Sequence, residues 1–163
     1  MTIQPEIQSI IESTHQACRV DKTLNFPQAI RRLAEAGIES YHTDYRRKET
    51  TYYLPNGESH AVRDTMHHEA VADPFDSAAV STAVRFAQAD PPDYTYEKFV
   101  GLTCRAGCVG YFVWIAGQKV QYFGRRGEIR AVGCHPCGGG QVVALLLATS
   151  MHLLAAPIGT GLV

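Results

Sequence analysis

Residues Phe26 to Val62, FPQAIRRLAEAGIESYHTDYRRKETTYYLPNGESHAV, recur in altered form at Tyr96 to Val132, 70 positions further along the chain. With no gap, 8 of the 37 positions are identical, whereas unrelated stretches would share about two or three on ordinary amino-acid usage. The matches include glycines, which fix local backbone geometry. We interpret the pattern as a tandem duplication. The matching residues are Ala36, Gly37, Tyr41, Tyr52, Gly57, Glu58, Ala61 and Val62 in the first copy and Ala106, Gly107, Tyr111, Tyr122, Gly127, Glu128, Ala131 and Val132 in the second.

The first copy has the pattern of two helices followed by a strand meander. Apolar residues spaced three and four apart predict a helix over Glu6–Cys18. Asn25 and Gln28 predict a capping box that opens a second helix, which would end at Gly37. Beyond Gly37 the apolar period falls to two, and turn residues interrupt it twice. Three strands are therefore expected before residue 63.

The second copy repeats this plan with different residues. Asp76–Gln88 has a helical pattern, Thr95 is the expected N-cap of the next helix, and three strand-like runs follow Gly107. We therefore predict an α+β fold with two tandem ααβββ repeats, 4–62 and 74–132, related by a pseudo-twofold axis. A polar linker, 63–73, would join them within a single domain, 1–132. The helices would pack on one face of antiparallel sheet, as either one six-stranded sheet or two three-stranded sheets.

Composition excludes several classes of protein. The chain has 163 residues, of which 45% are hydrophobic and 19% charged, and its formal net charge is −1. A chain of this length and balance folds around a real core, and it gives no electrostatic reason to expect nucleic acid as a partner. The first ten residues lack the basic and apolar regions of a secretory signal, and five cysteines indicate reduced thiols. We expect a cytoplasmic protein.

The final segment, 133–163, differs from the rest of the chain in composition. No Asp, Glu, Lys or Arg occurs from Ala131 to Val163. Val142–Ala156 is mainly apolar but shorter than the span of about 20 residues that a membrane helix needs. Three accounts stay open: a helix packed on the domain or on a partner chain, a membrane-associating tail, or an extension created by a changed reading frame.

Two repeated segments, AGIESYHTDYRRKETTYYLPNGE and AGCVGYFVWIAGQKVQYFGRRGE, carry a family resemblance. Together with PFDSAAVSTAVRFAQ and YTYEKF between them, they resemble the YbcV-like bacterial proteins. That is a family of short proteins of unknown function, some of them prophage-encoded and often called phage envelope proteins. The resemblance covers roughly Ile7 to Glu128 and implies a small α+β protein, with no catalytic residue to carry over.

The cysteines suggest two chemical sites. Cys104 and Cys108 are four residues apart, but they match the small or apolar Ala34 and Ile38, which favours buried structural cysteines. Cys134, His135 and Cys137 have the CxxC spacing of a redox or zinc motif. Glycines follow this motif, whereas a reactive CxxC needs a helix N-terminus and zinc needs two further ligands. A thiol- or metal-dependent enzyme that uses these residues, or His67, His68 and Glu69, is the alternative hypothesis.

The linker and two hairpin turns provide the other polar candidates. His67, His68 and Glu69 could form an imidazole and carboxylate metal site, although a solvated connector is the simpler interpretation. The basic clusters at Arg46–Lys48 and Arg125–Arg126 lie beside aromatic residues, as in proteins that bind single-stranded nucleic acid. The first cluster has no basic counterpart in the second copy, so we interpret it as a solvated turn.

Four residues present in both copies are the candidate binding residues. Tyr41 and Tyr111 could line a groove between the repeats, although aromatic core is the default role at a strand start. Glu58 and Glu128 could face each other across the symmetry axis and share a proton, although a role in the turn is favoured. We find no complete set of nucleophile, base and orienting group. The sequence therefore favours a binding or interaction module without a cofactor, for which a homo-oligomer or a protein partner is conceivable.

Overall fold

The computed structural model describes residues 3–133, which form four helices and six strands. The predicted tail beyond residue 133 lies outside the described residues. Turn signals and the change of apolar period place these elements within a few residues of their expected bounds. In chain order they are α1 (Pro5–Arg19), α2 (Phe26–Glu35), β1 (Ser40–Asp44), β2 (Glu49–Tyr53), β3 (Ser59–Arg63), α3 (Ser77–Ala89), α4 (Tyr96–Arg105), β4 (Cys108–Trp114), β5 (Lys119–Gly124) and β6 (Ile129–Gly133).

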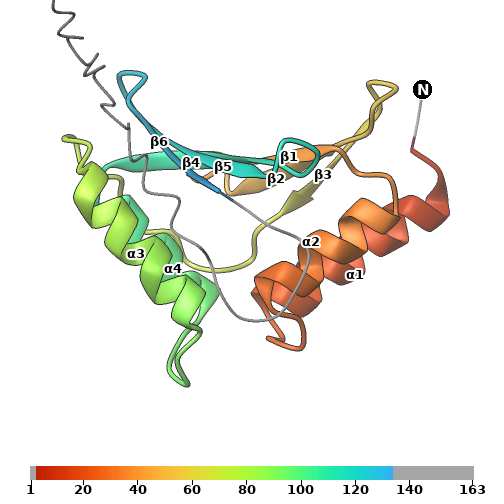
Figure 1. The fold of residues 1–163 in the computed structure, drawn as a ribbon, viewed down its shortest axis with the longest axis horizontal. Helices are drawn as coiled ribbons and strands as arrows, with labels where there is room; N and C mark the ends of the chain where they lie inside the picture. The colour runs from red at the N-terminus through yellow and green to blue at the C-terminus, as the bar shows by residue number, and fades with distance from the viewer. Residues whose placement is uncertain (1–2, 134–163) are drawn as a thin grey trace, which may run out of the picture.

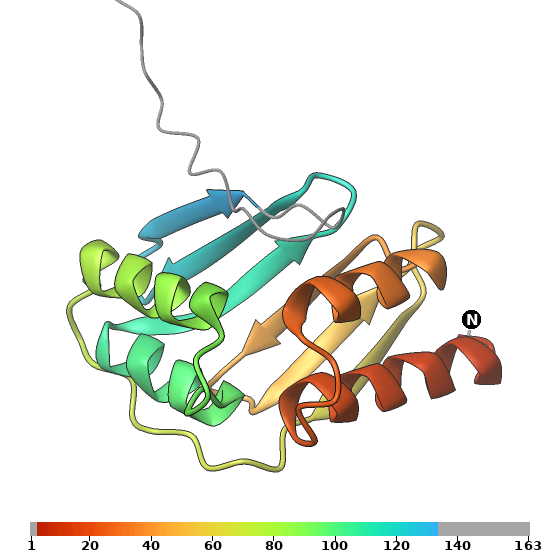
Figure 2. The same ribbon diagram turned by 60° about the horizontal axis from the view of Figure 1, so that its bottom comes forward.

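The strands form one six-stranded antiparallel sheet in the order β3-β2-β1-β4-β5-β6. Of the two arrangements that the sequence allowed, the single sheet is the one observed. The central pair is β1 and β4, in which His42 lies opposite Phe112. All four helices cover the same face of the sheet, α1 and α2 as one pair and α3 and α4 as the other (Figure 1; Figure 2). The predicted α+β fold with helices packed on antiparallel sheet is confirmed.

Local signals fix the ends of the helices. The Asn25 side chain accepts a hydrogen bond from the backbone of Gln28, whose side chain accepts one from the backbone of Asn25, so the predicted capping box is confirmed. The Asp76 side chain caps α3 by accepting hydrogen bonds from the backbone N–H groups of Ala78 and Ala79. Gly37 and Gly107 follow α2 and α4 with φ of 82° and 80°. Only glycine adopts this left-handed conformation cheaply, so both helices end where the sequence predicted.

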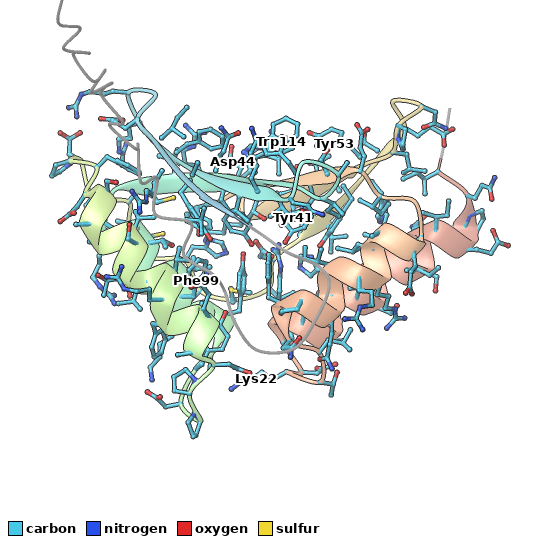
Figure 3. All side chains as sticks on the ribbon, viewed as in Figure 1. Lys22, Tyr41, Asp44, Tyr53, Phe99 and Trp114 are labelled. Atoms are coloured by element: carbon cyan, nitrogen blue, oxygen red, sulfur yellow. The ribbon has the colours of Figure 1, made fainter. Side chains whose placement is uncertain are left out.

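The core lies between the helices and the inward face of the sheet. Side chains alternate across a strand, so Tyr41, Tyr52, Tyr111 and Tyr122 all point toward the helices and are at most 6% exposed. Figure 3 shows Tyr41 and Phe99 on this side of the sheet and Asp44, Tyr53 and Trp114 on the other. Tyr41 and Tyr111 therefore have the core position expected of aromatic residues at a strand start, and Tyr52 and Tyr122 pack beside them.

Two features differ from the sequence-based expectation, the end of the first helix and the exposure of the linker. The first helix continues to Arg19, one residue beyond its predicted end at Cys18. The linker after β3 is not simply solvated, because Asp64 and His68 are both 8% exposed and lie beneath the sheet. Polar residues predict solvent exposure only when they have no buried partner, and Asp64 finds two partners on α1, His15 and Arg19. Among the described residues, no helix combines the length and the apolar character that a membrane span requires.

Candidate functional site: a buried polar cluster

A buried guanidinium lies between the two helix pairs. Arg19, the last residue of α1, is 8% exposed. Its Nη1 donates to Thr50 Oγ1 at 2.7 Å and to Asp64 Oδ1 at 3.1 Å. Its Nη2 donates to Thr43 Oγ1 at 3.0 Å and to the Tyr111 hydroxyl at 3.1 Å. The four terminal N–H groups of the guanidinium are thus all used, which is what a buried charge requires.

Aromatic rings complete the surroundings of this guanidinium. Its carbon atom lies 4.6 Å from the centre of the Tyr96 ring and 5.9 Å from that of Tyr41. The Tyr96 and Tyr111 hydroxyls are 2.8 Å apart. Because Tyr96 belongs to α4 and Arg19 to α1, these contacts connect the two helix pairs through the centre of the molecule.

Asp64 is the anion that compensates Arg19. Its Oδ1 lies 3.1 Å from His15 Nε2, and His15 Nδ1 lies 2.9 Å from the Tyr52 hydroxyl. A carboxylate only accepts hydrogen bonds, so the neutral His15 donates one from Nε2 to Asp64. Its Nδ1 then accepts a hydrogen bond from the Tyr52 hydroxyl. The result is a chain of hydrogen bonds that runs from Tyr52 through His15 and Asp64 to Arg19.

His68 adds a second imidazole without a complete set of partners. Its Nε2 lies 3.6 Å from Asp64 Oδ2, which is too long for a hydrogen bond. Among the described residues, neither His68 ring nitrogen, nor Asp64 Oδ2, nor Thr14 Oγ1 has a hydrogen-bond partner. Buried polar atoms are normally hydrogen-bonded, so these atoms could form hydrogen bonds with an additional polar group. We call the whole set the Arg19 cluster: His15, Arg19, Thr43, Thr50, Asp64, His68 and Tyr111.

The protonation states of the cluster follow from burial and charge. Burial alone would raise the pKa of Asp64, but the His15 hydrogen bond and the Arg19 charge outweigh it and lower that pKa. Burial lowers the pKa of His15, and the charge of Arg19 adds to this effect. Burial also lowers the pKa of His68. At neutral pH the cluster therefore holds one cation, one anion and two neutral imidazoles.

A pocket opens beside the cluster. It has a volume of about 300 Å³, at the lower end of the range for small-ligand sites. Arg19 belongs both to the buried cluster and to the wall of this pocket. The pocket, which we call the Arg19 pocket, is lined by Arg19, Val20 and Lys22 at the end of α1, Thr65 and Met66 in the linker, and Thr95 and Glu97 at the start of α4.

Two of the predicted binding residues meet beneath the sheet. The rings of Tyr41 and Tyr111 are 6.3 Å apart in an edge-on arrangement, and each side chain is 4% exposed. Both surround Arg19, Tyr111 through its hydroxyl and Tyr41 through its ring. They are therefore core residues that also shape the polar cluster.

The other two predicted binding residues lie apart. Glu58 follows the turn between β2 and β3, and Glu128 follows the turn between β5 and β6, at opposite edges of the sheet. Glu128 Oε2 accepts a hydrogen bond from the backbone N–H of Arg126, and the Glu58 backbone N–H donates to Asn56. These contacts are those of turn residues, and the two carboxylates do not face each other.

The candidate metal residues of the linker do not converge. His67 and Glu69 are exposed, Glu69 pairs with Arg105, and His68 is buried beside Asp64. Within residues 3–133, no group of three or more His, Cys, Asp or Glu side chains could hold a metal ion. Cys134, His135 and Cys137 lie outside the described residues.

The cysteines at the end of α4 and the start of β4 are buried. Cys104 and Cys108 are both 0% exposed. Burial raises the pKa of Cys104 to about 11 and that of Cys108 to about 12. Neither thiol forms a reactive thiolate at neutral pH. The prediction that these cysteines are buried is confirmed.

Sequence reasoning missed the most polar part of the site. Asp64 was assigned to the polar linker and Arg19 lies just beyond the predicted first helix, because charged residues at the ends of apolar patterns are usually solvated. One signal was present: Ile11, His15 and Arg19 are four residues apart and so share one face of α1. Nothing in the spacing of Asp64 indicates that the linker folds back under the sheet.

The architecture and the site together define the class of protein: an α+β domain in which helix pairs on one face of an antiparallel sheet enclose a buried charged cluster. The chain belongs to the family described as protein of unknown function (DUF1398), whose model matches residues 14–130. No curated protein matches the sequence. The family match covers nearly all of the described fold, including every residue of the Arg19 cluster.

Proposed function

We propose that this protein is a non-catalytic binding module whose ligand site is the Arg19 pocket. The observation that carries the proposal is the set of unpaired buried polar atoms on Asp64 and His68, in a cluster that shares Arg19 with the pocket wall. Buried charges that serve stability alone are usually fully paired, and partly unpaired ones concentrate at functional sites.

A tandem duplication with pseudo-twofold symmetry is part of this proposal. Each cross-strand pair of the first meander has a counterpart 70 residues later, as Tyr41 and Tyr52 have in Tyr111 and Tyr122. His42 lies directly opposite Phe112, its own counterpart, which is where a twofold axis would cross the sheet. Positive φ angles recur at the same spacing, at Gly37 and Gly107, Lys48 and Gln118, and Gly57 and Gly127.

The Arg19 cluster departs from this symmetry. Its threonines Thr43 and Thr50 correspond to Val113 and Val120, and Arg19 corresponds to Ala89. Because apolar residues occupy these three positions in the second repeat, the repeat fold does not itself require polar residues there. The second repeat has alanine and valine where the first has the arginine and the two threonines that bind it, and a buried charge that the fold can do without favours a role in binding.

The lining residues indicate the ligand. The charge of Arg19 is compensated by Asp64, which leaves Lys22 and Glu97 as opposite charges on the rim. The Thr65 and Thr95 hydroxyls can exchange hydrogen bonds, and Met66 and Val20 supply apolar contact. Such a pocket fits a small zwitterionic molecule, with its anionic group near Lys22 and its cationic group near Glu97. The YbcV-like resemblance adds a prophage-associated bacterial origin to the proposal.

The test is a thermal-shift screen of small zwitterions, such as amino acids and betaines, against the full chain. We expect at least one of them to raise the melting temperature in a saturable way. The variant Met66→Trp adds bulk to the pocket wall and leaves Asp64 and His68 in the sequence, so it should abolish the shift. A matched control, Ser81→Trp, places the same bulk in a recess on α3, far from Arg19 in the fold, and should retain the shift.

Two outcomes would overturn the proposal. A ligand that stabilises Met66→Trp as well as the native chain binds elsewhere. A screen at millimolar concentration in which no zwitterion changes the melting temperature would show that the pocket does not bind this class.

A further inference from the structure

The face of the sheet that the helices leave uncovered is available for binding (Figure 1; Figure 3). We call this surface the open face. The cross-strand registers arrange its residues in three rows. The first row is Arg63, Glu49, Asp44, Gly110, Phe123 and Ile129. The middle row is Ala61, Thr51, His42, Phe112, Gln121 and Ala131, and the third is Ser59, Tyr53, Ser40, Trp114, Lys119 and Gly133.

Aromatic side chains gather at the centre of the open face. The Phe112 and Trp114 rings are stacked with centroids 4.1 Å apart, and Tyr53 and His42 stack on Phe112 at 6.0 and 5.6 Å. Trp114 is 37% exposed, and Ile129 at the edge of the face is 55% exposed. Contiguous apolar surface of this kind on a folded domain marks an interaction site.

The charges of this face are balanced. The middle row contains no Asp, Glu, Lys or Arg on any of the six strands. The three rows contain two acidic residues, Asp44 and Glu49, and two basic ones, Arg63 and Lys119. In the turn after β1, Arg46 pairs with Asp44 and Arg47 with Glu49, at 3.2 and 3.1 Å. A surface that faces an identical surface must avoid opposing like charges, and the neutral middle row meets this condition.

We propose that the open face is a homodimer interface, in which two copies of this chain pack their sheets face to face. Six strands about 4.8 Å apart, with five residues each at about 3.3 Å, give a face of about 450 Å² in projection. Side chains increase the accessible area beyond this projection. A face-to-face pair would bury on the order of 1,200 Å² in total, the lower end of specific interfaces.

The orientation of the rings favours this partner over nucleic acid. Rings that stack on one another along the sheet turn their faces toward their neighbours and their edges toward solvent. Single-stranded nucleic acid requires exposed ring faces on which bases stack, together with free cations for the phosphates. Arg46 and Arg47 are already paired with carboxylates, and the other two cations of this face, Arg63 and Lys119, lie in different outer rows, on β3 and β5. Ring edges pack well against the edges and side chains of another protein surface.

Trp114 is the only tryptophan in the chain, and it reports on this interface. We expect sedimentation velocity of the full chain to show a monomer–dimer equilibrium between micromolar and millimolar concentration. Tryptophan emission should shift to the red on dilution, as Trp114 becomes exposed to water.

Charged substitutions test whether association uses this face. Trp114→Lys should weaken dimerisation by about 30-fold or more, because a central aromatic contact is replaced by a desolvated charge. Tyr53→Lys should do the same and retains Trp114 for fluorescence. Phe26→Lys is the matched control, since Phe26 is 40% exposed but belongs to α2, on the helical side. It should leave dimerisation unchanged.

Other results would overturn the inference. A chain that stays monomeric at millimolar concentration has no such interface. Association that persists in both Trp114→Lys and Tyr53→Lys uses another surface, and association of the native chain only in the presence of single-stranded nucleic acid would identify the other class of partner.

Discussion

Replacing Arg19 by methionine should strongly destabilise the protein. Methionine fills much of the same space but removes the positive charge, which leaves Asp64 as a buried carboxylate with a neutral imidazole as its remaining partner. Breaking a buried ion pair in this way costs about 3–5 kcal/mol of unfolding free energy. The loss of the single cation should therefore remove a large part of the total stability of the domain.

The structure identifies the orphaned carboxylate as the main cause of this loss. Without Arg19, Thr43 Oγ1 and Thr50 Oγ1 still bond each other at 2.9 Å, and the Tyr111 hydroxyl still bonds Tyr96 at 2.8 Å. The hydroxyls of the cluster thus keep partners, and only Asp64 loses its compensation. The double variant Arg19→Met/Asp64→Asn should recover at least about 2 kcal/mol, because an amide carries no charge to desolvate.

Urea denaturation followed by circular dichroism measures these free energies. Arg47→Met is the matched control, because it breaks the Arg47 pair with Glu49 where the arginine side chain is 67% exposed, and such pairs are worth about 0–1 kcal/mol. If Arg19→Met costs no more than this control, or if the double variant is as unstable as Arg19→Met, the orphaned charge does not dominate and the reasoning is wrong.

Three further predictions concern other parts of the fold. Burial lowers the pKa of His15 and His68 below the ordinary value of 6.5, so the unfolded chain takes up protons first as the pH falls. Stability should therefore be full above about pH 6.5 and decrease below it. In thermal melts taken between pH 7 and 5, His68→Gln should reduce the dependence of the melting temperature on pH. Gly107→Ala should cost about 1–3 kcal/mol more than Gly37→Ala in the same denaturation assay, because both have positive φ but only at Gly107 would the new Cβ lie 2.1 Å from a backbone carbonyl oxygen of the linker; equal losses would contradict the close contact. The Cys108 thiol, buried and with its pKa raised to about 12, should react with a thiol reagent only after unfolding, and labelling of the native protein at this residue would contradict its burial.

The sequence could predict most of the fold because the fold is encoded by local patterns. The capping box at Asn25, the glycines that end α2 and α4, and the alternation that points Tyr41, Thr43 and Tyr45 to one side all act over a few residues. These signals set the order of elements and the inward face of β1. They could not set how the two halves join, since the pairing of His42 with Phe112 connects residues 70 positions apart.

The candidate site could be predicted only in part, for the same reason. Tyr41 and Tyr111 were found because they recur, and recurrence is visible in a sequence. Arg19 and Asp64 do not recur. They form an ion pair only because the linker passes beneath the sheet and places the Asp64 carboxylate beside the end of α1.

Sequence alone determined the two helix pairs, the strands and the aromatic core of this protein, because periodicity and turn chemistry are local properties. Tertiary structure alone decided that six strands form one sheet, that a charged pair is buried beneath it, and that a row of aromatic rings is left uncovered above it. Each of these depends on which distant residues approach one another, and that is fixed by packing and by the pairing of buried polar groups.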